Sequence, residues 1–276
     1  MTVATALQQG TKLLEDGAVP VPKLTAEVLL SHALKKERIF LFAHPEHELS
    51  EVAWIHYGRY LHERIGGKPT QYITKRQEFY GRDFRVTPAV LIPRPETEFV
   101  VEEALRWCTP ESKVLDVCTG SGAIAVTIAL EKQMPVLASD LSGDALLVAK
   151  CNAMTLGAQV DFVRMDLLEG IRHGVLDVLT ANPPYVAESQ REGLQREVRD
   201  FEPPLALFGG PEGTEVYSRL IRQAADVLRP GGRLVLELGF NSLPAVRTFA
   251  EPFFDDEIVR HDLAGFQRVF SARRKV

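Results

Sequence analysis

The segment Asn182-Pro183-Pro184-Tyr185 carries the most distinctive chemistry in this sequence, and it directly follows the apolar run 175–181. Two consecutive prolines lack amide hydrogens and fix their own φ angles, so the carbonyl oxygens around them stay free to accept hydrogen bonds. The side-chain oxygen of Asn182 and the carbonyl of Pro183 can each accept one hydrogen of an NH2 group, while the Tyr185 ring stacks behind its plane. We interpret the segment as a rigid acceptor platform for a planar nitrogen.

Methyl transfer is the reaction that suits such a platform. An amide or aromatic amine nitrogen held by two acceptors loses planarity, and its lone pair can then turn toward an electrophilic methyl group. The proton can leave after the positively charged product forms, so the reaction requires no general base. The alternative is an ordinary Asn-Pro turn without a ligand.

A glycine-rich turn follows another apolar run, 114–117, and consists of Cys118, Thr119, Gly120, Ser121 and Gly122. Its glycines let the backbone turn tightly and approach a ligand closely. The turn departs from the G-x-G-x-x-G pattern of dinucleotide enzymes, because Ala125 occupies the position of the third glycine.

Two acidic residues follow the next apolar runs. Asp140 lies about 20 residues after the turn, where an acid can accept hydrogen bonds from both hydroxyls of a ribose. Asp166 can accept the exocyclic amine of an adenine whose ring lies against Leu167. These positions predict a nucleoside cofactor. The alternatives are that Asp140 caps a helix from Ser142, and that Asp166 caps the turn after it.

Arg94 stands between two prolines in the segment Ile92-Pro93-Arg94-Pro95-Glu96-Thr97-Glu98. It can shape the entrance for a partner's loop, and so contribute to substrate binding, or it can bind the carboxylate of a cofactor. The alternative is a structural ion pair between Arg94 and a local glutamate.

Hydrophobic patterning divides the chain into three parts. Helical spacing of apolar residues predicts a helical bundle over residues 1–68, with Ser50 as the cap of a helix that begins at Glu51. Residues 69–95 read as a linker with a β-hairpin, formed by the runs 78–80 and 83–86. From residue 96 to 276, strands at 114–117, 135–139, 160–165, 175–181 and 232–238 alternate with helices, which predicts an α/β fold with a mostly parallel sheet.

Composition limits the classes of function. The 276 residues have a formal net charge of -5, so no overall positive field attracts nucleic acid. Three cysteines, Cys108, Cys118 and Cys151, are expected to be small apolar fillers, and the seven histidines show no metal-ligand spacing. The sequence shows no secretory signal and no membrane-spanning run. We expect a cytoplasmic protein without a metal site.

The motifs together resemble the HemK/PrmC family of release factor glutamine methyltransferases. Beyond the glycine turn, Asp140 and Asn182 to Tyr185, the resemblance extends over nearly the whole chain. It includes Gln71-Tyr72-Ile73, Leu91 to Glu98, Glu202-Pro203-Pro204, Ala206 to Gly210, Gly265 and Arg268.

This resemblance implies a class I, Rossmann-like methyltransferase domain with a mostly parallel seven-stranded sheet, behind an N-terminal domain that binds the substrate. It also implies that S-adenosylmethionine donates a methyl group to the glutamine N5 in the Gly-Gly-Gln motif of class 1 peptide chain release factors, with S-adenosylhomocysteine as the product. By the same analogy, Cys118 to Gly122, Asp140, Asp166, Leu167 and Asn182 contact the cofactor, and Asn182 to Tyr185 hold the glutamine. The family usually has glycine at the position of Cys118 and often a bulky aromatic residue at that of Leu167.

Two other functions remain open from the sequence. An adenine-N6 methyltransferase acting on nucleic acid shares the Asn-Pro-Pro-Tyr chemistry, but it predicts a basic groove and a base-flipping domain. A non-enzymatic nucleoside-binding sensor would leave the acceptor platform without a role.

Overall fold

The computed structural model describes residues 1–276 and divides them into two compact units. Unit 1 comprises Met1–Arg76 together with Gln195–Phe201, and unit 2 comprises Gln77–Leu194 together with Glu202–Val276. The chain therefore leaves unit 2 for a short segment and returns to it. No helix is both long and apolar enough to cross a membrane.

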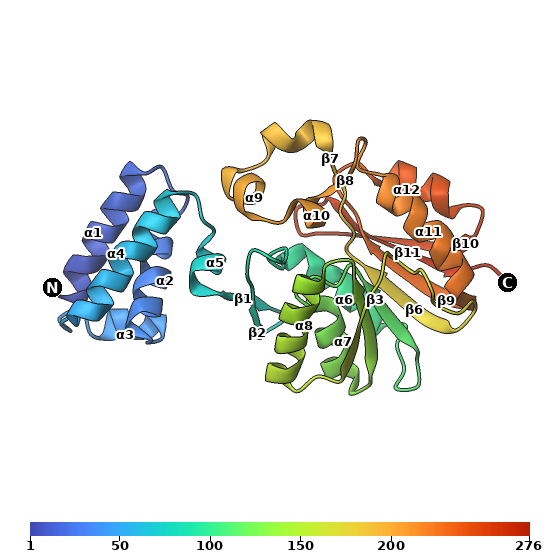
Figure 1. The fold of residues 1–276 in the computed structure, drawn as a ribbon, viewed down its shortest axis with the longest axis horizontal. Coiled ribbons are helices and arrows are strands. Elements are labelled where there is room, and N and C mark those ends of the chain that lie inside the picture. Colours follow the sequence, from blue (N-terminus) through green and yellow to red (C-terminus); the bar gives the residue numbers. More distant parts are fainter. The chain divides into compact units, whose positions relative to one another are not determined.

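Unit 1 is helical, and its first helices form a bundle (Figure 1). Buried side chains such as Leu14, Leu29 and Tyr57 fill the core between these helices. The Ser50 side chain accepts a hydrogen bond from the Ala53 amide and caps the fourth helix, as predicted. The helices are α1 (Val3–Asp16), α2 (Pro22–Leu34), α3 (Arg38–Ala43), α4 (Glu51–Ile65), α5 (Thr70–Thr74) and α9 (Arg196–Phe201).

Polar contacts hold the returning segment within unit 1. Arg64 on α4 is buried, and its guanidinium forms an ion pair of 2.7 Å with Glu197 on α9. The neighbouring Arg196 donates a hydrogen bond of 2.7 Å to the carbonyl of Gly66. A buried arginine requires such a partner, because removing an unpaired charge from water is costly.

The main element of unit 2 is a seven-stranded sheet in the order β10-β11-β9-β6-β3-β4-β5. The pairs from β9 to β5 are parallel, while β11 is antiparallel to both β9 and β10. The predicted mostly parallel sheet is confirmed. The strands are β3 (Val114–Val117), β4 (Val136–Asp140), β5 (Val160–Arg164), β6 (Leu176–Ala181), β9 (Leu228–Glu237), β10 (Phe254–His261) and β11 (Gln267–Arg274).

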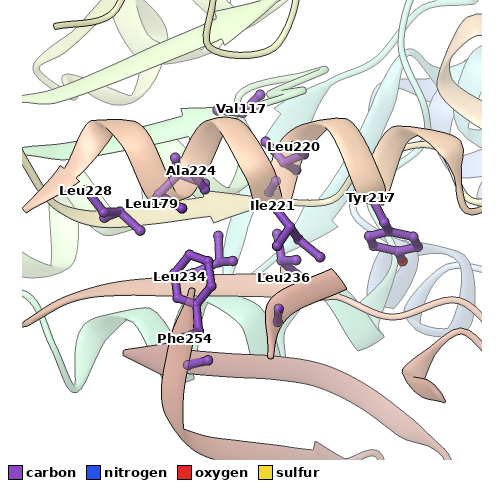
Figure 2. Close-up of a cluster of buried hydrophobic side chains, with 14 of the residues drawn as sticks. Val117, Leu179, Tyr217, Leu220, Ile221, Ala224, Leu228, Leu234, Leu236 and Phe254 are labelled. Atoms are coloured by element: carbon purple, nitrogen blue, oxygen red, sulfur yellow. The ribbon is translucent and has the colours of Figure 1, made fainter. Parts of the chain in front are cut away.

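Helices cover both faces of this sheet, because side chains alternate between faces along each strand. Leu179, Leu234 and Leu236 face α11 (Glu215–Val227) and α12 (Leu243–Ala250), and Figure 2 shows the α11 side chains that pack on them. Val178 and Val235 belong to the second core, on the side of α6 (Glu98–Leu105), α7 (Ala123–Lys132) and α8 (Gly143–Leu156). Both cores are continuous with the strand ends that carry the site.

The remaining strands and helices are short, and all but the first residue of β1 belong to unit 2. The predicted hairpin consists of β1 (Arg76–Phe79) and β2 (Arg82–Arg85). A second, two-stranded parallel sheet pairs β7 (Val186–Ala187) with β8 (Phe208–Gly210). The remaining elements are the 3-10 helices η1 (Pro95–Thr97) and η2 (Glu188–Gly193), and the short helix α10 (Pro204–Leu207).

Candidate active site

A cavity of about 450 Å³ opens at the carboxyl ends of the parallel strands β3, β4, β5 and β6. Ligands of open α/β sheets bind at this edge. Nine of the residues predicted to act in the site line this one cavity: Cys118, Thr119, Gly120, Ser121, Asp140, Asp166, Leu167, Asn182 and Pro184. Gly122, Pro183, Tyr185 and Arg94 do not line it, and each has a different position, described below.

The glycine turn connects β3 to α7 through three residues of left-handed conformation. Cys118 has a φ of 57°, Gly120 of 55° and Gly122 of 81°. A side chain at Gly122 would meet the β-carbon of Ala149 at 3.1 Å, so this glycine permits the close packing of α7 on α8. Cys118 adopts a conformation that normally favours glycine. Burial raises the pKa of its thiol, which fits the predicted apolar filler better than a nucleophile.

Asn152 on α8 fixes the position of the glycine turn through its side-chain hydrogen bonds. Its side-chain amide donates to the carbonyl of Ser121 at 2.8 Å and to that of Arg85 at 3.0 Å, while its oxygen accepts from the Arg85 amide at 2.8 Å. One buried side chain thus ties the turn to the hairpin strand β2.

Asp116 in the middle of β3 was not predicted as a site residue. It is fully buried and accepts hydrogen bonds from the hydroxyls of Thr119 at 2.6 Å and Thr180 at 2.7 Å. Burial raises the pKa of this carboxyl from 3.8 to about 7. The residue links the glycine turn to the end of β6, and the sequence signal for it is an acid within the apolar run 114–117.

Asp140 at the end of β4 uses one oxygen to accept from the Gly120 amide and the other to accept from the Ser142 amide, both at 2.9 Å. Ser142 itself caps α8 by accepting from the Ala145 amide. The alternative that Asp140 merely caps this helix is therefore wrong. Burial raises the pKa of Asp140, and the backbone amides act in the opposite direction. Each carboxylate oxygen has further acceptor capacity for a ligand in the cavity.

Asp166 and Leu167 follow β5. The Asp166 carboxylate forms an ion pair of 2.7 Å with Arg219 of α11, which also lines the cavity. Leu167 is buried with a left-handed φ of 50°. Arg219 was not predicted from the sequence, because its partner is distant along the chain.

The acceptor loop, Asn182 to Tyr185, begins where β6 ends. Pro183 is buried, and the carbonyl of Pro184 lies so close to Gly209 that a β-carbon there would be 2.5 Å from it. β8 therefore packs directly on the acceptor loop. The Tyr185 ring lies against Gly239, and its hydroxyl donates to Glu237 at 3.4 Å.

Hydrogen bonds connect Asn182 to Thr97, in η1, which also lines the cavity, and through it to Glu237, at the end of β9. The Thr97 hydroxyl donates to the Glu237 carboxylate at 2.6 Å and accepts from the Asn182 side-chain amide at 3.3 Å. Burial raises the pKa of Glu237 from 4.5 to about 7. Sequence reasoning missed both roles. The available signals were the acid in the apolar run 232–238 and the place of Thr97 in the motif around Arg94.

Arg94 forms an ion pair of 2.5 Å with Glu202, whose side chain is almost fully buried. Glu202 also accepts from the Ile92 amide at 3.3 Å. The alternative of a local glutamate as the partner of Arg94 is wrong, since the glutamate comes from a segment 108 residues further on. The pair joins two stretches that line the cavity, residues 88–93 and 203–208.

Known proteins resemble this chain in sequence and in fold. Residues 5–74 match the PrmC N-terminal domain, and residues 97–198 match the methyltransferase small domain. A release factor glutamine methyltransferase from Koribacter versatilis is 44% identical over 99% of both chains. One from Moorella thermoacetica is also 44% identical, over 100% of this chain and 99% of the relative. The crystal structure of the hMettl16 catalytic domain, solved with a MAT2A 3′UTR hairpin, superposes with a TM-score of 0.58 at 17% identity, covering 74% of this chain and 79% of that one.

The sheet order, the cavity at its carboxyl edge and the matched domain define a methyltransferase with a Rossmann-like catalytic unit. Within that class, identity to curated relatives over the full length is decisive. The chain belongs to the release factor glutamine methyltransferase family.

Proposed function

We propose that this chain transfers a methyl group from S-adenosylmethionine to the side-chain N5 of the glutamine in the Gly-Gly-Gln motif of class 1 peptide chain release factors. The observation that carries the proposal is the acceptor loop at the edge of the cavity, in a chain that matches release factor glutamine methyltransferases from end to end. The three free cysteines suit the reducing cytoplasm, where we place the reaction.

The lining residues suit the proposed cofactor. Asp140 offers two carboxylate oxygens for ribose hydroxyls, and the left-handed glycine turn offers backbone groups beside it. Asp166 and Leu167 offer an acceptor and an apolar surface for an adenine. When bound, S-adenosylmethionine supplies an electrophilic methyl group.

The chain's own residues then prepare the nucleophile. The Asn182 side-chain oxygen and the Pro183 carbonyl accept the two hydrogens of the glutamine NH2 group, which turns the nitrogen lone pair toward the methyl carbon. The nitrogen–carbon bond forms as the carbon–sulfur bond breaks, with its electron pair remaining on sulfur. One N–H proton passes to water afterwards, so no side chain needs to act as a base.

The decisive experiment measures transfer of labelled methyl groups from S-adenosylmethionine to purified, unmodified release factor. A factor with Gly-Gly-Ala at its tip and a DNA duplex serve as parallel substrates. Label is expected only in the protein that carries the glutamine. Label in DNA would favour the adenine-N6 alternative instead, and cofactor binding without any transfer would favour the sensor.

Two variants complete the design. Asn182→Ala should abolish most of the transfer, because it removes one of the two acceptors. Met154→Ala is the matched control, since Met154 is 75% exposed on α8 and lines no part of the cavity. Equal activity of the two variants would contradict the role given to the acceptor loop.

A further inference from the structure

A chain of buried polar groups runs beneath the acceptor loop. Glu237 is 2% exposed and Thr97 is 4% exposed, and both lie in unit 2. The carboxylate, the Thr97 hydroxyl and the Asn182 amide are connected in sequence by hydrogen bonds of 2.6 and 3.3 Å. Three distant segments, at residues 97, 182 and 237, therefore meet at one point. Buried polar networks of this kind are costly unless every member has a partner, and they then fix a single arrangement.

The Thr97 hydroxyl has one proton, and this fact determines the direction of the chain. When Glu237 is ionised it can only accept, so Thr97 must donate its proton to the carboxylate. Thr97 then has only lone pairs to offer to Asn182, and Asn182 must present its NH2 group. The oxygen of the Asn182 amide is consequently turned away from Thr97.

The second oxygen of Glu237 supports the other end of the acceptor loop, by accepting from the Tyr185 hydroxyl. Tyr217 of α11 fixes the backbone at the same place: its hydroxyl donates to the Glu237 carbonyl at 2.7 Å and accepts from the Gly239 amide at 3.1 Å. Glu237 is thus held by its main chain and by both carboxylate oxygens.

We infer that Thr97 and Glu237 are positioning residues, which orient the Asn182 amide so that its oxygen, rather than its NH2 group, receives the substrate nitrogen. A flipped amide would place two donors against the NH2 group of the substrate and could not bind it. The inference deepens the proposed function and rests on it for the identity of the substrate group. The orientation of Asn182 itself is independent of that function.

The charges around Glu237 agree with this role. Burial, and to a smaller extent Glu96 of η1, oppose its ionised form, while the Thr97 and Tyr185 hydroxyls and Arg268 of β11 favour it. The hydroxyls of Tyr185 and Tyr217 are the other titratable groups facing it, and burial raises the pKa of both well above the neutral range. A protonated Glu237 would allow Thr97 to donate toward Asn182. Methyl transfer should therefore rise with pH as Glu237 ionises.

The first test observes the orientation directly. In protein labelled with ¹⁵N and saturated with S-adenosylhomocysteine, the Asn182 side-chain NH2 protons should exchange slowly with water. Thr97→Val keeps the branched shape but removes the hydroxyl, and it should make this exchange fast. Thr97→Ser keeps the hydroxyl and should preserve the slow exchange.

The second test is kinetic. Thr97→Val should lower kcat for the release factor about tenfold, the typical value of one hydrogen bond, with the affinity for S-adenosylhomocysteine within about twofold of the wild type. Thr97→Ser should restore most of kcat. Glu237→Gln should flatten the rise of kcat with pH. If Thr97→Val does not fold, Thr97→Ala takes its place, because a smaller side chain cannot clash.

The outcomes separate the two proposals. Slow exchange of the Asn182 amide in Thr97→Val, a kcat within twofold of the wild type, or equal defects in the Val and Ser variants would each overturn the inference. A wild-type protein that binds S-adenosylhomocysteine but does not methylate the release factor would refute the proposed function. The amide-exchange result would still decide the orientation of Asn182.

Discussion

The two walls of the cavity are built in different ways. The cofactor wall consists of strand ends and a left-handed turn, and its acidic residue Asp140 is held by backbone amides. The acceptor wall depends on side chains beneath it, with Glu237 and Thr97 connected to Asn182 and Tyr185. Backbone amides hold Asp140 in place, and no substitution of a neighbouring side chain removes them, whereas Asn182 and Tyr185 depend on the side chains of Thr97 and Glu237. Substitutions on the two sides should therefore affect different steps.

The largest effect is expected on the acceptor wall. Asn182→Ala should lower kcat by about 10²–10³, comparable to the loss of one oriented group that stabilises a transition state. Affinity for S-adenosylhomocysteine, measured by calorimetry, should fall much less than kcat. A larger loss in affinity than in kcat would assign Asn182 mainly to the cofactor wall and remove the contrast.

The cofactor wall should show the reverse pattern. Asp140→Ala should weaken S-adenosylhomocysteine binding by about tenfold to hundredfold, the usual value of hydrogen bonds to a charged group. At saturating S-adenosylmethionine, kcat should change little. Calorimetry and steady-state kinetics on the same preparation check both numbers, and a normal Kd would exclude the ribose-binding role of Asp140.

A smaller effect concerns stability and pH. Burial raises the pKa of Asp116 to about 7, so between about pH 4 and pH 7 the folded protein holds a proton that the unfolded chain has released. The proton retained by Asp116 contributes to the free energy of unfolding. This contribution is fully present below about pH 4 and is lost as the pH rises through about 7. Glu237, with its pKa raised to about 7, acts in the same direction.

Asp116→Asn should therefore reduce the loss of stability between about pH 4 and pH 7, the window given by this linkage. Urea unfolding at both pH values measures the difference. The absolute stability of the variant is not the test, because the amide cannot accept from both Thr119 and Thr180. An unchanged difference between the two pH values would show that Asp116 does not carry the proton.

The smallest effect is expected at Cys118. Its left-handed φ of 57° is costly for a side chain with a β-carbon, so Cys118→Gly relieves strain while it gains freedom in the unfolded chain. The two contributions should nearly cancel, within about 1 kcal/mol. Cys118→Val should be destabilising by about 2 kcal/mol, because a branched side chain suits this conformation least. Thermal unfolding compares the two, and a Val variant as stable as the Gly variant would contradict the argument from strain.

The sequence predicts the site residues at the strand ends better than it predicts the residues that hold them in place. Asp140 and Asn182 follow apolar runs and lie at the same edge of a parallel sheet, so their proximity follows from the order of the elements. Thr97 and Glu237 meet only through tertiary packing, at a separation of 140 residues. No local pattern encodes such a pair. The antiparallel strands β10 and β11 were likewise not predicted individually, since neither shows a regular alternation of buried and exposed positions.

The ion pair of Arg94 also joins segments that are distant along the chain. Ion pairs predicted from the sequence favour near neighbours, which is why the alternative given for Arg94 was a pair with a local glutamate. The fold instead brings Glu202 to Arg94, from the point where the chain re-enters unit 2. Side chains that join distant segments require the three-dimensional structure, whereas those that follow a strand can be located in advance.

The excursion of Gln195–Phe201 into unit 1 limits how the protein can be divided. A single cut after Arg76 would release an N-terminal fragment in which buried Arg64 has lost the counter-charge of Glu197. Such a fragment should be a poor autonomous folding module. Exchange of the N-terminal unit between relatives would accordingly require two grafts, the first 76 residues and the seven-residue insert that completes them. The two units therefore alternate along the chain, and neither consists of a single continuous segment.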